Sequence, residues 1–189
     1  MKTELLELHK KILTCTLCRL SESRKNAVPG EGAFDTSLVL VGEAPGRNED
    51  LLGRPFVGAA GAFLTKLLSA IGVDRDRIFI TNVVKCRPPM NRPPRVDEVN
   101  ACHSYLERQI SLINPRIICL MGNNAIKAVL GKGYSISEMH GKQVETANRR
   151  FFLTYHPAAV LYAESLEETM MNDFKALANI LKPPNYNHI

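Results

Sequence analysis

The sequence predicts an α/β protein in which helices cover both faces of a mainly parallel sheet. Three short apolar runs rich in β-branched residues predict buried strands, because a strand covered on both faces is apolar along its whole length. Helical patterns separate these runs, and such alternation is typical of a three-layer α/β/α sandwich. The chain has 189 residues, and we expect it to form a single domain over residues 1–189.

The expected elements follow one another along the chain in a regular alternation. Strands are expected at residues 37–41, 78–83 and 116–121, with a weaker pair at residues 143–146 and 150–154. Apolar residues at helical spacing predict helices at residues 3–13, 60–71, 96–113, 123–130 and 165–181. In sheets of this kind ligands bind at the carboxyl ends of the strands. We therefore expect the chemistry to lie in the segments that follow the strands.

Composition excludes several classes of protein. Hydrophobic residues make up 45% of the chain and charged residues 23%, so a full core can form and disorder is not the main state. No stretch approaches the ~18 apolar residues of a membrane-spanning helix. The start, MKTELLELHKK, mixes acids with apolar residues and predicts an amphipathic helix rather than a signal peptide. We therefore expect a cytoplasmic protein with reduced thiols and no membrane partner.

Charge leaves the choice of partner open. The formal net charge of +5 and a pI near 9.0 are compatible with a nucleic acid partner, although many other proteins share that balance. The segment RPPMNRPPR at residues 87–95 predicts a stiff extended loop, because proline restricts the backbone and removes a donor. No feature demands an oligomer, so we expect a monomer.

Five cysteines predict a metal or cluster site with one cysteine left over, rather than a disulfide framework. Cys15 and Cys18 form a C-x2-C pair, Cys86 follows the strand expected at 78–83, and Cys102 lies sixteen residues later. Four thiolates can hold either Zn²⁺ or an iron–sulfur cluster. The wide separation of the two single cysteines favours a cluster, and the spacing alone leaves zinc open. Cys119 lies among large apolar residues and is expected in the core.

Four side chains beside expected strand ends could edge one cavity. Glu43 in GEAPG, Phe56 in GRPFVG, Asn82 and His156 each have an ordinary explanation as a loop acid, a core ring, a turn cap and a structural histidine. Together they suit a flat heterocycle, because an amide supplies one acceptor and two donors beside an aromatic face. Arginine side chains bind phosphate groups, and we expect four of them to frame this cavity. They are Arg47, Arg54, Arg87 and Arg92.

Three long motifs lie in order between Cys15 and about Leu161, and they are GEAPGRNEDLLGRPFVGAAGAFLTKLL, ITNVVKCRPPMNRPP and TYHPAAVL. Together with the four cysteines, these motifs resemble those of the family 4 uracil-DNA glycosylases, the iron–sulfur enzymes of bacteria and archaea. The resemblance implies an α/β/α fold with a central four-stranded parallel sheet. It also implies a structural [4Fe-4S] cluster, with ligands Cys15, Cys18, Cys86 and Cys102.

The activity implied by this resemblance is that of a monofunctional uracil-DNA glycosylase, a hydrolase of base excision repair. Such an enzyme flips uracil out of double- or single-stranded DNA, hydrolyses the N-glycosidic bond, releases free uracil and leaves an abasic site. By the same resemblance Gly42 and Glu43 belong to the water-activating motif, and Phe56 stacks on the flipped base. Asn82 then reads uracil N3–H and O4, and His156 hydrogen-bonds O2.

Further matching positions refine the expected mechanism. Asn91 corresponds to a polar residue of the proline-rich loop that helps to place water, and residues 158–162 resemble the loop that enters the duplex. A related subgroup captures its product covalently through a histidine in a basic insertion. Residues 87–95 contain neither a histidine nor an insertion, so we expect no covalent capture of the product. Ala44 stands where relatives outside the family carry an aspartate, which excludes a general base at that position and leaves Glu43 as the substitute.

Three other functions remain open on the sequence. A nucleic-acid-binding module with structural zinc would bind without releasing a base. An electron carrier would expose its cluster to redox partners. A glycosylase could also prefer another base, such as a deaminated purine or a mismatched thymine.

Overall fold

The structure, a computed structural model, describes residues 2–182. A six-stranded sheet runs through its centre in the order β1-β3-β2-β4-β6-β5. The strands are β1 (Glu31–Gly32), β2 (Leu38–Gly42), β3 (Phe79–Asn82), β4 (Ile117–Met121), β5 (Lys142–Glu145) and β6 (Arg150–Thr154). β3, β2, β4 and β6 are parallel, and β1 and β5 pair antiparallel at the two edges. The expected four-stranded parallel centre is confirmed, with one antiparallel strand added on each side.

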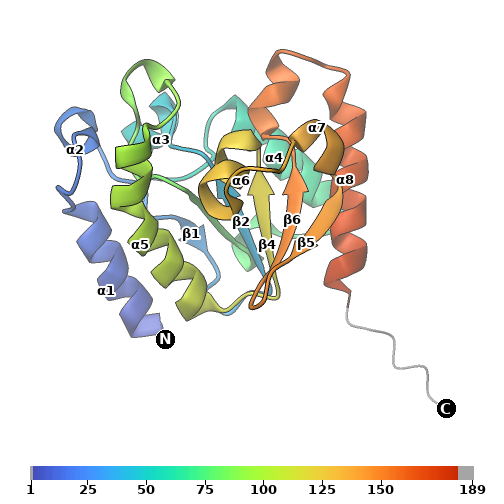
Figure 1. Cartoon of the computed structure of the whole chain (residues 1–189), viewed down its shortest axis with the longest axis horizontal. Coiled ribbons are helices and arrows are strands. Elements are labelled where there is room, and N and C mark those ends of the chain that lie inside the picture. The colour runs from blue at the N-terminus through green and yellow to red at the C-terminus, as the bar shows by residue number, and fades with distance from the viewer. Residues whose placement is uncertain (1, 183–189) are drawn as a thin grey trace.

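Helices cover both faces of the sheet and complete the predicted three layers (Figure 1). One face carries α1 (Lys2–Leu13), α5 (Val96–Ile113), α6 (Asn123–Leu130) and α7 (Ile136–Met139). The other face carries α4 (Ala59–Ala70) and α8 (Leu166–Leu181). In Figure 1, α1 lies beside α5 on one side of the molecule, and α4 lies beside α8 on the other. Each face of the sheet therefore has its own apolar core.

The register of the parallel strands brings their carboxyl ends to one edge. Gly42 at the end of β2 pairs with Asn82 at the end of β3, and Met121 of β4 pairs with Thr154 of β6. Every residue of β2, β3 and β4 is buried, as expected for strands that are covered on both faces. The segments that follow these strands therefore meet at the same edge of the sheet.

Sequence periodicity finds the long elements and misses the short ones. The helix α5 begins and ends as expected, and α1, α4, α6 and α8 lie within one or two residues of their predicted bounds. The short helices α2 (Leu20–Ser23) and α3 (Arg47–Leu52), together with α7 and β1, were not expected. Two to six residues are too few to show a period, so tertiary contacts decide the conformation there.

None of the helices within residues 2–182 combines the length and apolar character needed to cross a lipid bilayer. Cys119 lies on β4 with no exposed surface, which confirms its expected place in the core.

Candidate active site

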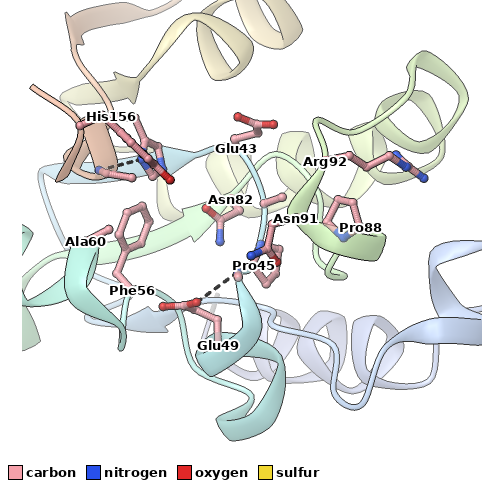
Figure 2. A pocket seen from close by; sticks show the side chains of 14 residues that line it. Glu43, Pro45, Glu49, Phe56, Ala60, Asn82, Pro88, Asn91, Arg92 and His156 are labelled. Atoms are coloured by element: carbon pink, nitrogen blue, oxygen red, sulfur yellow. Dashed lines mark hydrogen bonds between the residues drawn. The ribbon is translucent and has the colours of Figure 1, made fainter. Parts of the chain in front are cut away.

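A cavity of about 300 Å³ opens at the carboxyl edge of the sheet. Its walls come from segments that follow β2, β3 and β6, together with α3 and the start of α4. The side chains predicted to form the site, Glu43, Phe56, Asn82, Asn91 and His156, all line it. Figure 2 shows Phe56 and His156 on one side of the cavity, Asn91 on the other, and Asn82 between them. The structure therefore brings the expected aromatic ring, amide and imidazole to one small space.

Asn82 presents an unpaired amide to this cavity. It is the last residue of β3 and only 1% of its surface is exposed. Its Oδ1 atom is buried and has no hydrogen-bond partner among residues 2–182. A buried acceptor without a partner is costly, so such an oxygen on a residue that lines a cavity points to a ligand that donates a hydrogen bond.

Gly42 acts by leaving space rather than by lining the cavity. A Cβ atom at this position would overlap Asn82 Oδ1 and would lie 2.6 Å from Phe56 Cζ. Since glycine has no Cβ, the Phe56 ring and the Asn82 amide can both approach the end of β2. The absence of a Cβ at Gly42 thus lets the Phe56 and Asn82 side chains meet at the end of β2.

The Phe56 ring lies on a tight turn between α3 and α4. Its centroid is 5.5 Å from that of His156, and the two rings are stacked with an interplanar angle of 29°. Glu49 Oε1 accepts hydrogen bonds from the backbone N–H groups of Val57 at 2.8 Å and Gly58 at 2.9 Å. Glu49 also lines the cavity, and its role in holding this turn was not anticipated from the sequence.

His156 is held in one tautomer. Its Nδ1 atom accepts a hydrogen bond from the backbone N–H of Ala158 at 3.1 Å, so in the neutral ring the proton must be on Nε2. Burial lowers the pKa of His156 to about 4, against the opposing charge of Glu49. At neutral pH the ring is therefore an uncharged imidazole whose Nε2–H is available as a donor.

Glu43 follows β2 directly and contributes a half-buried carboxylate. Its Oε2 atom accepts a hydrogen bond from Asn124 Nδ2 at 2.9 Å, which restrains the carboxylate at the cavity wall. The neighbouring Ala44 also lines the cavity and offers no group that can accept a proton. Glu43 and Glu49 are the two carboxylates at the cavity, and Glu49 is occupied by backbone N–H groups.

The arginines are placed differently from the expectation. Of the four expected around the cavity, only Arg92 is among the residues that line it. Its guanidinium forms an ion pair with the buried Glu98 at 2.6 Å and points away from Asn82 (Figure 2). Arg54 is paired with Glu31 at 2.7 Å, and Arg87 donates to Asn91 Oδ1 at 2.7 Å. The expectation that these four side chains frame the cavity is therefore met by Arg92 alone among residues 2–182, and Arg54, Arg87 and Arg92 are each paired with an acceptor within the protein.

The four predicted ligand cysteines lie around a second, small cavity. Cys15 and Cys18 reach it from the segment after α1, Cys86 from the segment after β3, and Cys102 from α5. Among residues 2–182, no three His, Cys, Asp or Glu side chains are grouped so as to hold a single metal ion. The four cysteines nevertheless line one common space.

The surroundings of these sulfurs suit thiolate ligands. Cys86 Sγ accepts a hydrogen bond from Arg24 Nη1 at 3.0 Å, and Cys102 Sγ accepts one from the Lys85 backbone N–H at 3.4 Å. Cys15 Sγ accepts a third from the backbone N–H of Leu17 at 3.5 Å. Burial raises the pKa of the Cys86 thiol and raises that of Cys102 to about 11. A metal group that binds here must therefore displace thiol protons.

Comparison of the sequence with known proteins identifies a family to which the chain is similar. A sequence profile described as the uracil DNA glycosylase superfamily matches residues 29–182. A type-4 uracil-DNA glycosylase of Sulfurisphaera tokodaii is 44% identical over 94% of this chain and 85% of its own length. Enzymes of the same name from Archaeoglobus fulgidus and Pyrobaculum aerophilum are 43% and 45% identical, each over 90% of this chain and 90% and 91% of their own lengths.

Proposed function

Because the chain belongs to the uracil-DNA glycosylase superfamily, we propose that it hydrolyses the N-glycosidic bond of uracil in DNA. The products are free uracil and an abasic site, and the reaction begins base excision repair. The observation that carries this proposal is the unpaired, buried Oδ1 of Asn82 beside an aromatic ring and a neutral imidazole. The cavity is complete within one chain, which supports action as a monomer.

Uracil recognition is assigned to Asn82 and Phe56. Asn82 Oδ1 accepts from uracil N3–H, and Asn82 Nδ2 donates to O4. Cytosine presents an unprotonated N3 and an amino donor, so both amide groups would face the wrong partner. Sites built around such hydrogen bonds reject a mismatched base strongly, because buried groups are left unpaired. The Phe56 ring supplies the apolar face against which the base stacks.

Bond cleavage is assisted by groups that act on developing charge. As the glycosidic bond breaks, negative charge grows on the base and positive charge grows on the sugar. His156 donates its Nε2–H to uracil O2, and this hydrogen bond strengthens as that oxygen gains charge. A neutral donor fits the lowered pKa of His156 and its Nδ1 hydrogen bond to Ala158. The electron pair of the bond leaves with the base.

Water then attacks the sugar carbon. Glu43 is the carboxylate placed to favour the cationic sugar and to accept a proton from this water, since Ala44 can do neither. The hydrogen bond from Asn124 supports that assignment by restraining Glu43 at the cavity wall. Asn91, on the opposite wall, assists in placing the water, while its Oδ1 is held by Arg87.

Extrusion of the nucleotide precedes the chemistry, because a base inside a duplex cannot reach such a cavity. The segment Pro157–Leu161 and the following Tyr162 stand beside the cavity mouth, and Leu161 and Tyr162 are 56% and 91% exposed. Exposed apolar side chains of this kind can enter a base stack and stabilise the extruded state. This supports a role for residues 158–162 as the wedge.

The second cavity would hold a [4Fe-4S] cluster through Cys15, Cys18, Cys86 and Cys102. Four thiols around one space, three of them with N–H donors, are the donor set of such a cluster. The cluster would act structurally, because it ties the segment after α1 to β3 and α5.

The decisive experiment is a base-release assay on the purified protein. Duplex and single-stranded oligonucleotides carrying uracil, cytosine, thymine, hypoxanthine or xanthine at one position are incubated with it, and the released base is measured. We expect free uracil from both uracil substrates and an alkali-sensitive abasic site. Binding without release would instead identify a non-catalytic module, and release of another base would identify a different glycosylase. A protein that neither binds nor cleaves, yet undergoes reversible redox, would be an electron carrier.

A further inference from the structure

Phe56 has a backbone conformation that a bulky residue rarely adopts. Its φ angle is +50°, in the left-handed region that favours glycine. Such a conformation is strained and persists only where the surrounding contacts over-determine it. The groups that hold this turn therefore decide where the Phe56 ring lies in the cavity.

Two charged side chains hold the backbone of this turn, one by accepting hydrogen bonds from its N–H groups and the other by donating to its carbonyl groups. Glu49 accepts the N–H groups of Val57 and Gly58, which follow the strained residue. Arg75 donates from Nη1 to the Phe56 carbonyl at 2.9 Å and from Nη2 to the Pro55 carbonyl. Arg75 thus binds the carbonyl groups at and immediately before the strained residue.

Arg75 is itself firmly anchored. It begins the 3-10 helix Arg75–Arg77, and its side chain is only 17% exposed. Its Nη2 and Nε atoms donate to Glu31 Oε1 on β1 at 2.8 Å and 3.2 Å. A planar guanidinium can hold a carboxylate and two carbonyl groups at once, which the single ammonium of a lysine does not reproduce. The edge strand β1 is therefore connected through Arg75 to the ring in the cavity.

We propose that Arg75 is a positioning residue that holds the Phe56 ring against the extruded base. The inference rests on the proposed function and adds a residue that lies outside the cavity to its machinery. Arg75 is not among the cavity-lining residues, so it acts through the turn rather than on the base. Without it, Asn82 at the end of β3 and His156 after β6 keep their places, while the turn at Phe56 loses the donors to its two carbonyl groups.

Arg54 provides a matched control. It also pairs with Glu31, at 2.7 Å, but its side chain is 62% exposed, and its hydrogen bonds within residues 2–182 go to that carboxylate alone. Removal of Arg54 therefore changes the same ion-pair cluster without freeing the Phe56 turn. An exposed ion pair of this kind contributes little, so we expect Arg54→Ala to keep the inhibition constant of free uracil within about twofold of the wild-type value.

The test compares Arg75→Met with the wild type and Arg54→Ala. Methionine keeps much of the apolar stem and removes every donor. We expect the inhibition constant of free uracil to rise and the single-turnover rate to fall by about 5- to 100-fold each, the effect of losing one base–aromatic stack. Affinity for a duplex with an abasic site should change by less than about threefold, because the phosphate contacts that dominate DNA affinity remain.

A double-mutant cycle with Phe56→Ala separates positioning from a general structural effect. If Arg75 acts through the ring, Arg75→Met should weaken uracil binding by no more than about twofold in the Phe56→Ala background. Additive losses would overturn the inference, as would wild-type uracil affinity in folded Arg75→Met. If Arg75→Met does not fold, Arg75→Lys takes its place with an expected loss of at least about threefold, because one ammonium cannot reproduce the fixed fork by which the guanidinium spans Glu31 and both carbonyl groups. Wild-type uracil affinity in Arg75→Lys would then refute the role.

The outcome is distinguishable from failure of the proposed function. A wild-type protein that releases no uracil from DNA would overturn the function itself. A wild-type protein that releases uracil, with an Arg75→Met variant equal to it in uracil affinity, would overturn only the role of Arg75.

Discussion

Replacing Asn82 with aspartate should weaken the preference for uracil over cytosine. The amide is buried and makes two complementary hydrogen bonds with uracil in the proposed complex, and cytosine would leave both amide groups unpaired. Each buried, unpaired group costs about 1–3 kcal/mol. Two such groups correspond to about 2–6 kcal/mol, or a preference of roughly 30-fold to 10⁴-fold in the wild type.

The carboxylate of Asn82→Asp has the shape of the amide but cannot donate to uracil O4. Cleavage at uracil should therefore fall by roughly 10- to 100-fold, the effect of one unpaired buried group. The same carboxylate can accept the amino group of cytosine, so the remaining preference for uracil should shrink to within about tenfold.

Single-turnover rates on matched duplexes that carry uracil or cytosine opposite guanine measure this preference. Asn82→Ala is the control, because it removes both hydrogen bonds and should slow uracil cleavage without helping cytosine. A wild-type ratio of the two rates in Asn82→Asp would refute the assignment of base recognition to Asn82.

Predictions at three further residues rest on the described contacts. His156→Ala should lower the single-turnover rate of cleavage by about 10²-fold or more, because loss of one donor to a developing oxyanion has an effect of that size. DNA binding should change little. Near-normal cleavage would remove His156 from the mechanism. Because burial lowers the pKa of His156 from 6.5 to about 4, cleavage controlled by His156 should be independent of pH from 6 to 8 and fall as the pH approaches 4. The unfolded chain binds this proton more readily, so the contribution of His156 to stability is constant above pH 6.5 and is lost as pH falls toward about 4, which urea titrations at several pH values can follow. Gly42→Ala should destabilise the fold by about 1–3 kcal/mol and weaken inhibition by free uracil, since its Cβ would displace Phe56 or Asn82; unchanged melting and inhibition would contradict that packing. Cys86→Ser should lose iron and visible absorption whereas Cys119→Ala, outside the cysteine cavity, retains both; a colourless wild type with stoichiometric zinc would overturn the cluster assignment.

The long elements and the candidate residues could be identified from the sequence because their signals are local. Apolar runs such as 117–121 and the period of α5 depend on neighbours within a few residues, and they survive in any fold that buries them. The motifs that contain Glu43, Asn82 and His156 could likewise be recognised, because they resemble those of a known family. No local pattern in the sequence indicates the short helices and the short strand β1, or the acceptors with which the arginines pair.

What the sequence by itself determined is therefore the layered fold, the family and the candidate side chains of the site. Tertiary structure alone decided how those side chains are prepared: the unpaired oxygen of Asn82, the tautomer and charge of His156, and the strained turn held by Arg75. The reason is that burial and hydrogen bonding act between residues far apart in the chain. Arg75 reaches back to Phe56 and to Glu31 only because β1, β3 and the turn meet in the folded protein.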